Sequence, residues 1–266
     1  MNGAGRGERE KIRLHVEGAL GAGQEVLLPR DQTHYLAHVL RRRPGSRVGL
    51  FNGRDGEWRA EMVEIGRAGA RLRILERIAP QGAPPDLWLL FAPVKKTRTD
   101  FIVEKAVELG AARVLPVRTR FTNTERLKSE RLRARAVEAA EQCGASWVPE
   151  IAELAPLGAL LAAWPAERQI FLADERLAGS GAPVFPPEAT AGPAAVLVGP
   201  EGGFSDEERA RLHALPAVRP LNLGPRILRA ETAAVAALAL WQARFGDWQG
   251  DSAGDAPSTG GEEGER

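Results

Sequence analysis

Short apolar runs separated by turn residues characterise the first eighty positions of the chain. Their spacing predicts strands over residues 12–16, 25–28, 47–51, 57–65 and 71–78. A stretch with helical spacing predicts a helix over residues 33–43, with Asp31 or Thr33 as its N-cap. The turn sequence Asn-Gly-Arg-Asp-Gly at 52–56 predicts a hairpin between two of the strands. Several short strands with one helix favour a small barrel-like domain over residues 11–79.

The hydrophobic pattern changes after residues 79–85, Ala-Pro-Gln-Gly-Ala-Pro-Pro, and we expect this stiff, turn-rich segment to mark a domain boundary. From residue 86 to 246, apolar runs typical of buried strands alternate with longer helical segments. The expected strands are 87–94, 114–117, 170–173, 195–199 and 218–221, and the expected helices are 100–109, 126–142, 206–215 and 231–245. This alternation predicts an α/β domain with a largely parallel sheet covered by helices.

Charge is unevenly distributed along the chain. The net charge is +1, but residues 247–266 contain six acids and one base, so this tail carries −5 and the remaining 246 residues carry +6. The tail is rich in Gly, Ser, Asp and Glu, and we expect it to be disordered. Only five of the 36 basic residues are lysine, and arginine is the residue best suited to binding phosphate and stacking on bases. A compositional bias would produce the same excess of arginine.

Several classes of protein are disfavoured by composition. The single cysteine, Cys143, allows no intrachain disulfide and no cysteine-based zinc cluster, which favours the cytoplasm. No apolar run approaches the roughly 20 residues of a membrane span, and the first residues lack the apolar segment of a signal peptide. The four histidines are scattered, so we expect neither a metal site nor a membrane partner.

The first candidate for chemistry follows an apolar strand. Residues 195–199 lead into Pro-Glu-Gly-Gly-Phe, and Ser205 with Glu208 then forms a capping-box pattern that predicts the start of a helix. Ligands bind beyond the carboxyl ends of strands in parallel sheets, and glycines let the backbone approach a ligand. A tight turn without function is the alternative. A phosphate loop is disfavoured because the Walker pattern and its lysine are missing.

The second candidate, residues 221–233, also leaves a strand, turns at Gly224-Pro225 and enters an Ala-rich helix. It places Arg226, Arg229 and Glu231 beside the start of that helix. Taken singly, each has a structural explanation, because Glu231 would complement the helix dipole and either arginine would be a solvated surface charge.

Taken together, the two segments are specific. Gly-Pro-Glu-Gly-Gly-Phe at 199–204 and Leu-Gly-Pro-Arg-Ile-Leu-Arg-Ala-Glu-Thr-Ala at 223–233 resemble the SPOUT class of methyltransferases. Within that class the chain resembles the RsmE-type family of 16S rRNA uridine N3-methyltransferases. Shorter matching pieces occur in the same order at 34–36, 39–41, 95–96, 104–110, 141–143, 148–151 and 173–175. The resemblance covers about residues 11–246 and does not include the acidic tail.

The resemblance implies an α/β fold with two domains. Residues 11–79 would form an N-terminal PUA-like β-barrel domain that binds RNA, and residues 86–246 a C-terminal SPOUT domain with a mainly parallel sheet and a trefoil knot. It also implies S-adenosylmethionine as cofactor and 16S rRNA, or the assembled small ribosomal subunit, as substrate. A homodimer is implied as well, with each active site close to the subunit interface.

Methylation of uridine at N3 requires that the N3 proton leave and that the resulting negative charge be stabilised. We expect Arg229 to stabilise it, with Arg226 as the alternate, and Glu231 either to accept the proton or to hold Arg229 in place. The residues expected to bind the cofactor are Gly199, Pro200, Glu201, Gly202, Leu223, Gly224, Ile227, Leu228 and Thr232. The residues expected to hold RNA are Arg41, Arg42, Arg43, Lys95, Lys96, Arg126 and Arg131.

Two other functions stay open at this point. Another SPOUT enzyme would methylate a ribose 2′-hydroxyl or a tRNA base with similar motifs. A non-catalytic RNA-binding assembly factor would keep the fold, although the intact glycines and arginines of both motifs disfavour a loss of catalysis. Solvated surface is the alternative explanation for each basic cluster.

Overall fold

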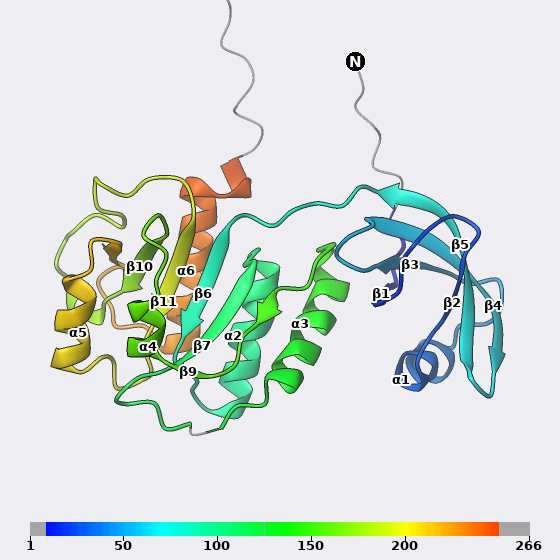
Figure 1. Cartoon of the computed structure of the whole chain (residues 1–266), viewed down its shortest axis with the longest axis horizontal. Coiled ribbons are helices and arrows are strands. Elements are labelled where there is room, and N and C mark those ends of the chain that lie inside the picture. Colours follow the sequence, from blue (N-terminus) through cyan, green and yellow to red (C-terminus); the bar gives the residue numbers. More distant parts are fainter. Residues whose placement is uncertain (1–8, 125, 250–266) are drawn as a thin grey trace, which may run out of the picture.

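The computed structural model describes residues 9–124 and 126–249 of the chain (Figure 1). The strands form two separate sheets, one before residue 80 and one after residue 86. One hydrophobic cluster packs against the first sheet, and two further clusters cover the two faces of the second.

The first sheet has five strands in the order β1-β3-β4-β5-β2. They are β1 (Arg13–His15), β2 (Glu25–Leu27), β3 (Arg47–Phe51), β4 (Glu57–Gly66) and β5 (Gly69–Ala79). All pairs are antiparallel except β1 with β3. Leu50, Met62 and Leu72, from three neighbouring strands, are fully buried in one core with Leu36 from the helical segment. The five strands and the hairpin predicted here are confirmed.

The predicted helix over residues 33–43 has the wrong limits. The structure has a helix α1 (Arg30–His34) followed by a π-helical turn η1 (Tyr35–Val39). Pro29 occupies the N-cap position instead of Asp31 or Thr33, because its fixed φ suits the start of a helix and its missing N–H is not needed there. Arg41, with φ of +52°, ends the helical path, so residues 41–43 follow the helix rather than forming its last turn.

The second sheet has seven strands, six of them in the order β12-β10-β11-β6-β7-β8, with β9 paired to β7. They are β6 (Leu87–Phe91), β7 (Arg113–Arg118), β8 (Glu150–Ile151), β9 (Ala155–Pro156), β10 (Gln169–Ala173), β11 (Ala194–Val198) and β12 (Val218–Leu221). Every pair is parallel, as the alternation of strands and helices predicted.

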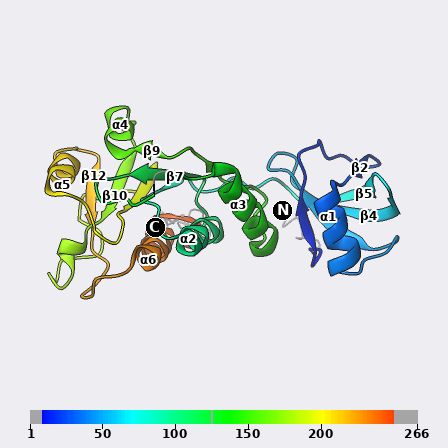
Figure 2. The same cartoon turned by 90° about the horizontal axis from the view of Figure 1, so that it is seen from below.

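Helices cover both faces of this sheet (Figure 2). They are α2 (Lys96–Glu108), α3 (Ser129–Cys143), α4 (Leu157–Ala162), α5 (Asp206–His213) and α6 (Ala230–Phe245). Leu87, Leu89 and Phe91 of β6 pack in the core shared with α2, α3 and α6, whereas Leu90 packs in the core shared with α4 and α5. Burial on both faces explains why the strands are continuous apolar runs.

The sequence pattern missed some elements of this part of the chain. Strands β8 and β9 have two residues each, too few for a periodic signal. Helix α4 lies in an Ala- and Leu-rich stretch with little polar contrast, so it showed no helical period. Helix α2 begins four residues earlier than predicted, at Lys96, and α3 begins at Ser129 rather than at residue 126.

A buried arginine joins the first sheet to α3. Nε of Arg13 donates to Oε1 of Glu57 at 2.8 Å, and both side chains are at most 5% exposed. The other guanidinium nitrogens donate to the carbonyl oxygens of Ala140 and Ala145, at 2.7 and 2.8 Å, at the carboxyl end of α3. Nearby, burial raises the pKa of the Glu141 carboxyl, although its hydrogen bond from the His15 amide opposes the shift. These contacts fix the first sheet against the second part of the chain.

The acidic tail is described only at its start. Residues 247–266 were predicted to be disordered, but Asp247–Gln249 form a short 3₁₀ helix after α6, and the Asp247 amide donates to Oε1 of Gln242 at 3.2 Å. The Gln242 side chain is itself fixed, because its Nε2 donates to the Leu109 carbonyl at 2.7 Å, and it therefore anchors the residues that follow α6. The rest of that prediction, residues 250–266, lies outside the described residues. Among the helices of the described ranges, none is both long and apolar enough to cross a membrane.

Candidate active site

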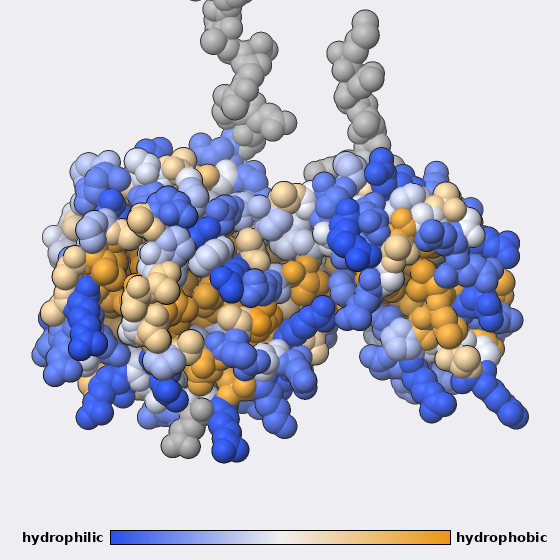
Figure 3. Space-filling view, viewed as in Figure 1, coloured by the Kyte–Doolittle hydropathy of each residue, from blue (hydrophilic) through white to orange (hydrophobic). Residues whose placement is uncertain are grey.

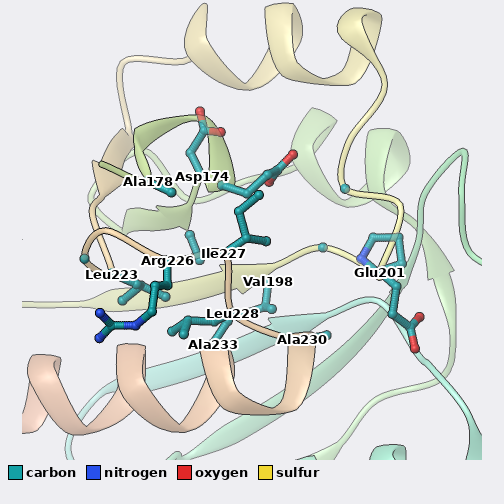
Figure 4. Close-up of a pocket in the computed structure, with 16 residues that line it drawn as sticks. Asp174, Ala178, Val198, Glu201, Leu223, Arg226, Ile227, Leu228, Ala230 and Ala233 are labelled. Atoms are coloured by element: carbon teal, nitrogen blue, oxygen red, sulfur yellow. The ribbon is translucent and has the colours of Figure 1, made fainter. Parts of the chain in front are cut away.

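Three loops at one edge of the second sheet enclose the candidate site. Strands β12, β10 and β11 are parallel neighbours, so the loops that follow them leave the sheet at the same edge. The residues that line the pocket between them are Ala173, Asp174, Glu175, Ala178, Val198, Gly199, Pro200, Glu201, Gly203, Leu223, Gly224, Arg226, Ile227, Leu228, Ala230 and Ala233. Figure 4 shows the three segments converging on this pocket. Both sequence motifs therefore contribute to one site.

The backbone of the first motif turns at Gly203. Its φ of +68° lies in the left-handed region, which favours glycine. A Cβ atom at this position would lie 3.1 Å from Cδ of Glu175 and closer still to Oε1. The chain then enters α5 through the predicted capping box, in which Ser205 and Glu208 each accept a hydrogen bond from the other's amide. Glycine at 203 thus lets the first motif lie directly against the loop after β10.

Two of the nine residues predicted to bind the cofactor do not line the pocket. Gly202 is exposed, and a Cβ atom there would lie 3.1 Å from Cβ of Phe121, away from the pocket. Thr232 is exposed on the first turn of α6. The other seven, all in the two motifs, do line it. Gly203 therefore lines the pocket and its neighbour Gly202 does not, although the prediction named Gly202 and left out Gly203.

A buried asparagine holds the second motif in place, and sequence reasoning missed it. Nδ2 of Asn222 donates to the Ala182 carbonyl at 2.6 Å, and its backbone amide donates to the Val184 carbonyl at 3.1 Å. Its Oδ1 accepts from the Gly224 amide at 3.0 Å. Asn222 therefore ties the long Gly- and Pro-rich loop after β10 to the turn that begins the second motif.

The three residues predicted to be catalytic lie at different places around the pocket. Arg226 lines it, whereas Arg229 is the exposed N-cap residue of α6, one residue before the lining residue Ala230. Glu231 follows in the first turn of α6 with its side chain 16% exposed. Its ion pair is with Arg98 of α2, at 3.4 Å between Nε and Oε1, and the expectation that it holds Arg229 stays a prediction.

An acidic pair after β10 forms one wall of the pocket. Asp174 and Glu175 both bind the guanidinium of Arg209 from α5, which donates to Glu175 at 2.6 Å. Burial opposes the charge on Arg209, but its hydrogen bond to Glu175 and the two carboxylate charges outweigh this and raise its pKa. Nε2 of His213 lies 3.2 Å from the other Asp174 oxygen. The sequence signals for this cluster were its position directly after a buried strand and the family-like piece at 173–175.

The residues predicted to hold RNA are spread over both parts of the chain. Residues 41–43 are exposed after η1, and Arg126 is exposed before α3. Lys95 and Lys96 are exposed at the start of α2, at the same edge of the sheet as the pocket. Arg131 differs from the others, because its guanidinium forms an ion pair with Asp100 that fixes α3 to α2. No group of three or more His, Cys, Asp or Glu side chains in the described part of the chain could hold a metal ion.

Comparison with known families gives two matches along the chain. The model of an RNA methyltransferase domain matches residues 82–242. The model of an RNA methyltransferase PUA domain matches residues 28–75. The first match contains the second sheet and both motifs, and the second lies within the five-stranded sheet.

Curated relatives and solved structures agree with these matches. Ribosomal RNA small subunit methyltransferase E of Rickettsia conorii is 28% identical over 239 residues, which are 85% of this chain and 93% of the relative. The Synechocystis protein of that name is 33% identical over 220 residues, 80% of this chain and 71% of the relative. The Neisseria gonorrhoeae enzyme bound to S-adenosylmethionine superposes with a TM-score of 0.79, at 26% identity over 89% of this chain and 98% of that one. A putative methyltransferase from Legionella pneumophila, also with S-adenosylmethionine bound, gives 0.74 at 29% identity over 88% and 98%.

The family model covers more than half of the chain, and its match contains the whole pocket, so the chain is a member of the RNA methyltransferase family. Within that class it belongs to the family of ribosomal RNA small subunit methyltransferase E. The resemblance drawn from residues 199–204 and 223–233 is confirmed. The predicted fold class, a SPOUT-type α/β domain with an N-terminal PUA-like domain, is confirmed as well.

Proposed function

We propose that the protein is an S-adenosylmethionine-dependent methyltransferase that methylates N3 of a uridine in 16S rRNA. The observation that carries the proposal is the meeting of both motifs at one pocket, at the carboxyl ends of three parallel strands. Residues 86–246 would form the catalytic domain. Residues 11–79 would form an RNA-binding domain, held against the catalytic domain through Arg13.

The chemistry of the pocket lining fits the cofactor. Small residues (Gly199, Gly203, Ala230 and Ala233) in the lining carry little side-chain bulk into the pocket, and Leu228 and its neighbours supply an apolar wall suited to an adenine ring. When bound, S-adenosylmethionine supplies a methyl group on a sulfonium sulfur, which is already a good leaving group. The protein therefore has mainly to position the base and to manage the N3 proton.

The two arginines of the second motif would have different roles. Arg226 lines the pocket, where a cation would pair with the carboxylate of the cofactor. Arg229 lies just outside the lining, where the base would approach. In the described part of the chain neither guanidinium forms an ion pair, so that of Arg229 is available to stabilise the negative charge that develops on the uridine.

Glu231 would accept the N3 proton. Its Oε2 atom is buried and has no hydrogen-bond partner among the described residues, so this oxygen can accept a proton directly or through a water molecule. This loss of the N3 proton would balance the methyl transfer, in which S-adenosylmethionine would supply the methyl group and be released as S-adenosylhomocysteine.

RNA would be held by the exposed basic residues that are free of ion pairs in the described ranges, namely residues 41–43, Lys95, Lys96 and Arg126.

We also propose that the enzyme works in the cytoplasm, where ribosomal RNA is found, and as a homodimer. Ile227 at the rim of the pocket is 76% exposed and Phe121 is 45% exposed, and apolar side chains of this kind are suited to a subunit interface. Figure 3 shows hydrophobic residues interrupting the hydrophilic surface of both domains on one face.

The experiment that tests the proposal is methyl transfer from labelled S-adenosylmethionine to 16S rRNA, supplied as naked RNA and as the assembled small subunit. Mass analysis of the digested nucleosides should give 3-methyluridine at one position. A labelled methyl group found on a ribose 2′-hydroxyl or on tRNA would instead show that the protein has another SPOUT methyltransferase activity. RNA binding without any transfer would assign a non-catalytic role. Light scattering, compared between wild type and Ile227→Asp, tests the dimer.

A further inference from the structure

Arg98 joins the two motifs of the site. It lies in the first turn of α2, and its side chain is 32% exposed. Nη1 donates to Oε1 of Glu201, in the first motif, at 3.1 Å. Nε lies 3.4 Å from Oε1 of Glu231, in the second motif. One planar guanidinium therefore links α2 to the loop after β11 and to the start of α6.

The contact leaves the two oxygens of Glu231 in different states. Oε1 faces the Arg98 cation, while Oε2 is buried without a hydrogen-bond partner in the described part of the chain. A buried acceptor without a partner is costly unless a ligand or water molecule satisfies it. Arg98 thus holds the carboxylate in an orientation that keeps one oxygen free, which is the arrangement that a proton acceptor needs.

We propose that Arg98 is a positioning residue with two separable effects. Through Glu231 it orients the carboxylate that takes the N3 proton, and this part rests on the function proposed above. Through Glu201 it fixes the loop after β11, which supplies several residues of the pocket lining, and so it supports cofactor binding whatever the methylated base.

Each effect has its own measurement. Arg98→Ala should lower kcat at saturating RNA and cofactor roughly 10- to 100-fold, because misplacing a reacting group by about 1 Å has effects of this size. The KM for RNA should stay near that of wild type. Calorimetry should show weaker binding of S-adenosylmethionine to Arg98→Ala, and a similar weakening in Glu201→Gln. Arg98→Lys should rescue only in part, since lysine keeps the charge but lacks the planar guanidinium whose Nη1 and Nε contact Glu201 and Glu231 separately.

Lys105→Ala is the matched control. Lys105 lies on the same helix, is 26% exposed and pairs with two glutamates, Glu104 and Glu108, at 2.8 and 2.7 Å, but it contacts neither motif. It should leave kcat and cofactor affinity unchanged. A loss equal to that of Arg98→Ala would show that any ion pair on α2 has this effect and would overturn the proposal.

The decisive comparison uses Glu231→Gln as background. If Arg98 acts on kcat through Glu231, adding Arg98→Ala to Glu231→Gln should lower kcat no further. A full additional loss would overturn the assignment, as would wild-type kcat and cofactor affinity in Arg98→Ala alone. If wild-type protein binds S-adenosylmethionine but transfers no methyl group to rRNA, the proposed function fails, and the calorimetric comparison still decides whether Arg98 supports the pocket.

Discussion

Replacing Gly203 by alanine tests whether the first motif needs glycine where it crosses Glu175. An L residue at φ of +68° is strained by about 1–2 kcal/mol. The added methyl group would also displace the Glu175 carboxylate from Arg209, which donates to it at 2.6 Å. Glu175 is 36% exposed, so this hydrogen bond contributes only about 1 kcal/mol. We therefore expect the free energy of unfolding to fall by about 2–3 kcal/mol.

Urea unfolding measures the loss, and Gly181→Ala separates its two parts. Gly181 has nearly the same φ, +73°, but a Cβ atom there would meet nothing within 4 Å. Its replacement should cost only the strain of about 1–2 kcal/mol. Calorimetry should show weaker cofactor binding in Gly203→Ala, because Gly203 and Glu175 both line the pocket, and unchanged binding in Gly181→Ala.

Removing the Glu175 carboxylate provides the decisive test. In a Glu175→Ala background no carboxylate is left to displace, so Gly203→Ala should cost the strain alone. The reasoning is refuted if Gly203→Ala destabilises the protein no more than Gly181→Ala does. It is also refuted if the cost of Gly203→Ala is the same with and without Glu175, because the contact with that side chain would then play no part.

Three further predictions concern catalysis, RNA binding and stability. Arg229→Ala should lower kcat roughly 10²–10³-fold, or about 2.7–4 kcal/mol, with little change in cofactor affinity, and Arg229→Lys should recover part of the lost kcat. Raising the pH should reduce the difference in kcat between Arg229→Ala and wild type, and the assignment is contradicted if saturating RNA brings the rate of Arg229→Ala back to that of wild type. Replacing residues 41–43 together by alanine should reduce the slope of log affinity against log salt by about 0.9 for each RNA phosphate that the variant no longer binds, measured by filter binding, and an unchanged slope would remove this cluster from the RNA-binding surface. Glu57→Gln leaves the guanidinium of Arg13 buried without its counter-charge, so urea unfolding should show a loss of about 3–5 kcal/mol; a loss below about 1 kcal/mol would mean that the carbonyl oxygens of α3 satisfy Arg13 by themselves.

The sequence by itself determined those features that depend on near neighbours along the chain. The strand over 71–78 was readable because charged and apolar residues alternate along it, as they do between the two faces of a half-buried strand. The capping box of Ser205 and Glu208 was readable because its partners are three residues apart. The two glycine- and arginine-containing motifs identified the family, since each is a contiguous segment whose residue types are specific when taken together.

Tertiary structure alone decided which residues of the two motifs reach the pocket. Gly202 and Gly203 are neighbouring glycines, yet only Gly203 has a positive φ and lines the pocket. A Cβ atom at 203 would meet Glu175, whereas a Cβ atom at 202 would meet Phe121. Local pattern also placed the helix at 33–43, whereas Pro29 and the left-handed Arg41 set its limits.

The ionic contacts that hold the site together were equally invisible in the sequence. Arg98 and Glu201 are 103 residues apart, and nothing in the local sequence around one of the chain's 31 arginines predicts which carboxylate it will pair with. The order β12-β10-β11 brings the three pocket loops to one edge, and the packing of α2 beside α6 brings Arg98 to Glu231. Such pairs follow from the path of the chain through the whole fold, because contacts between distant segments exist only after the sheet and its helices have assembled.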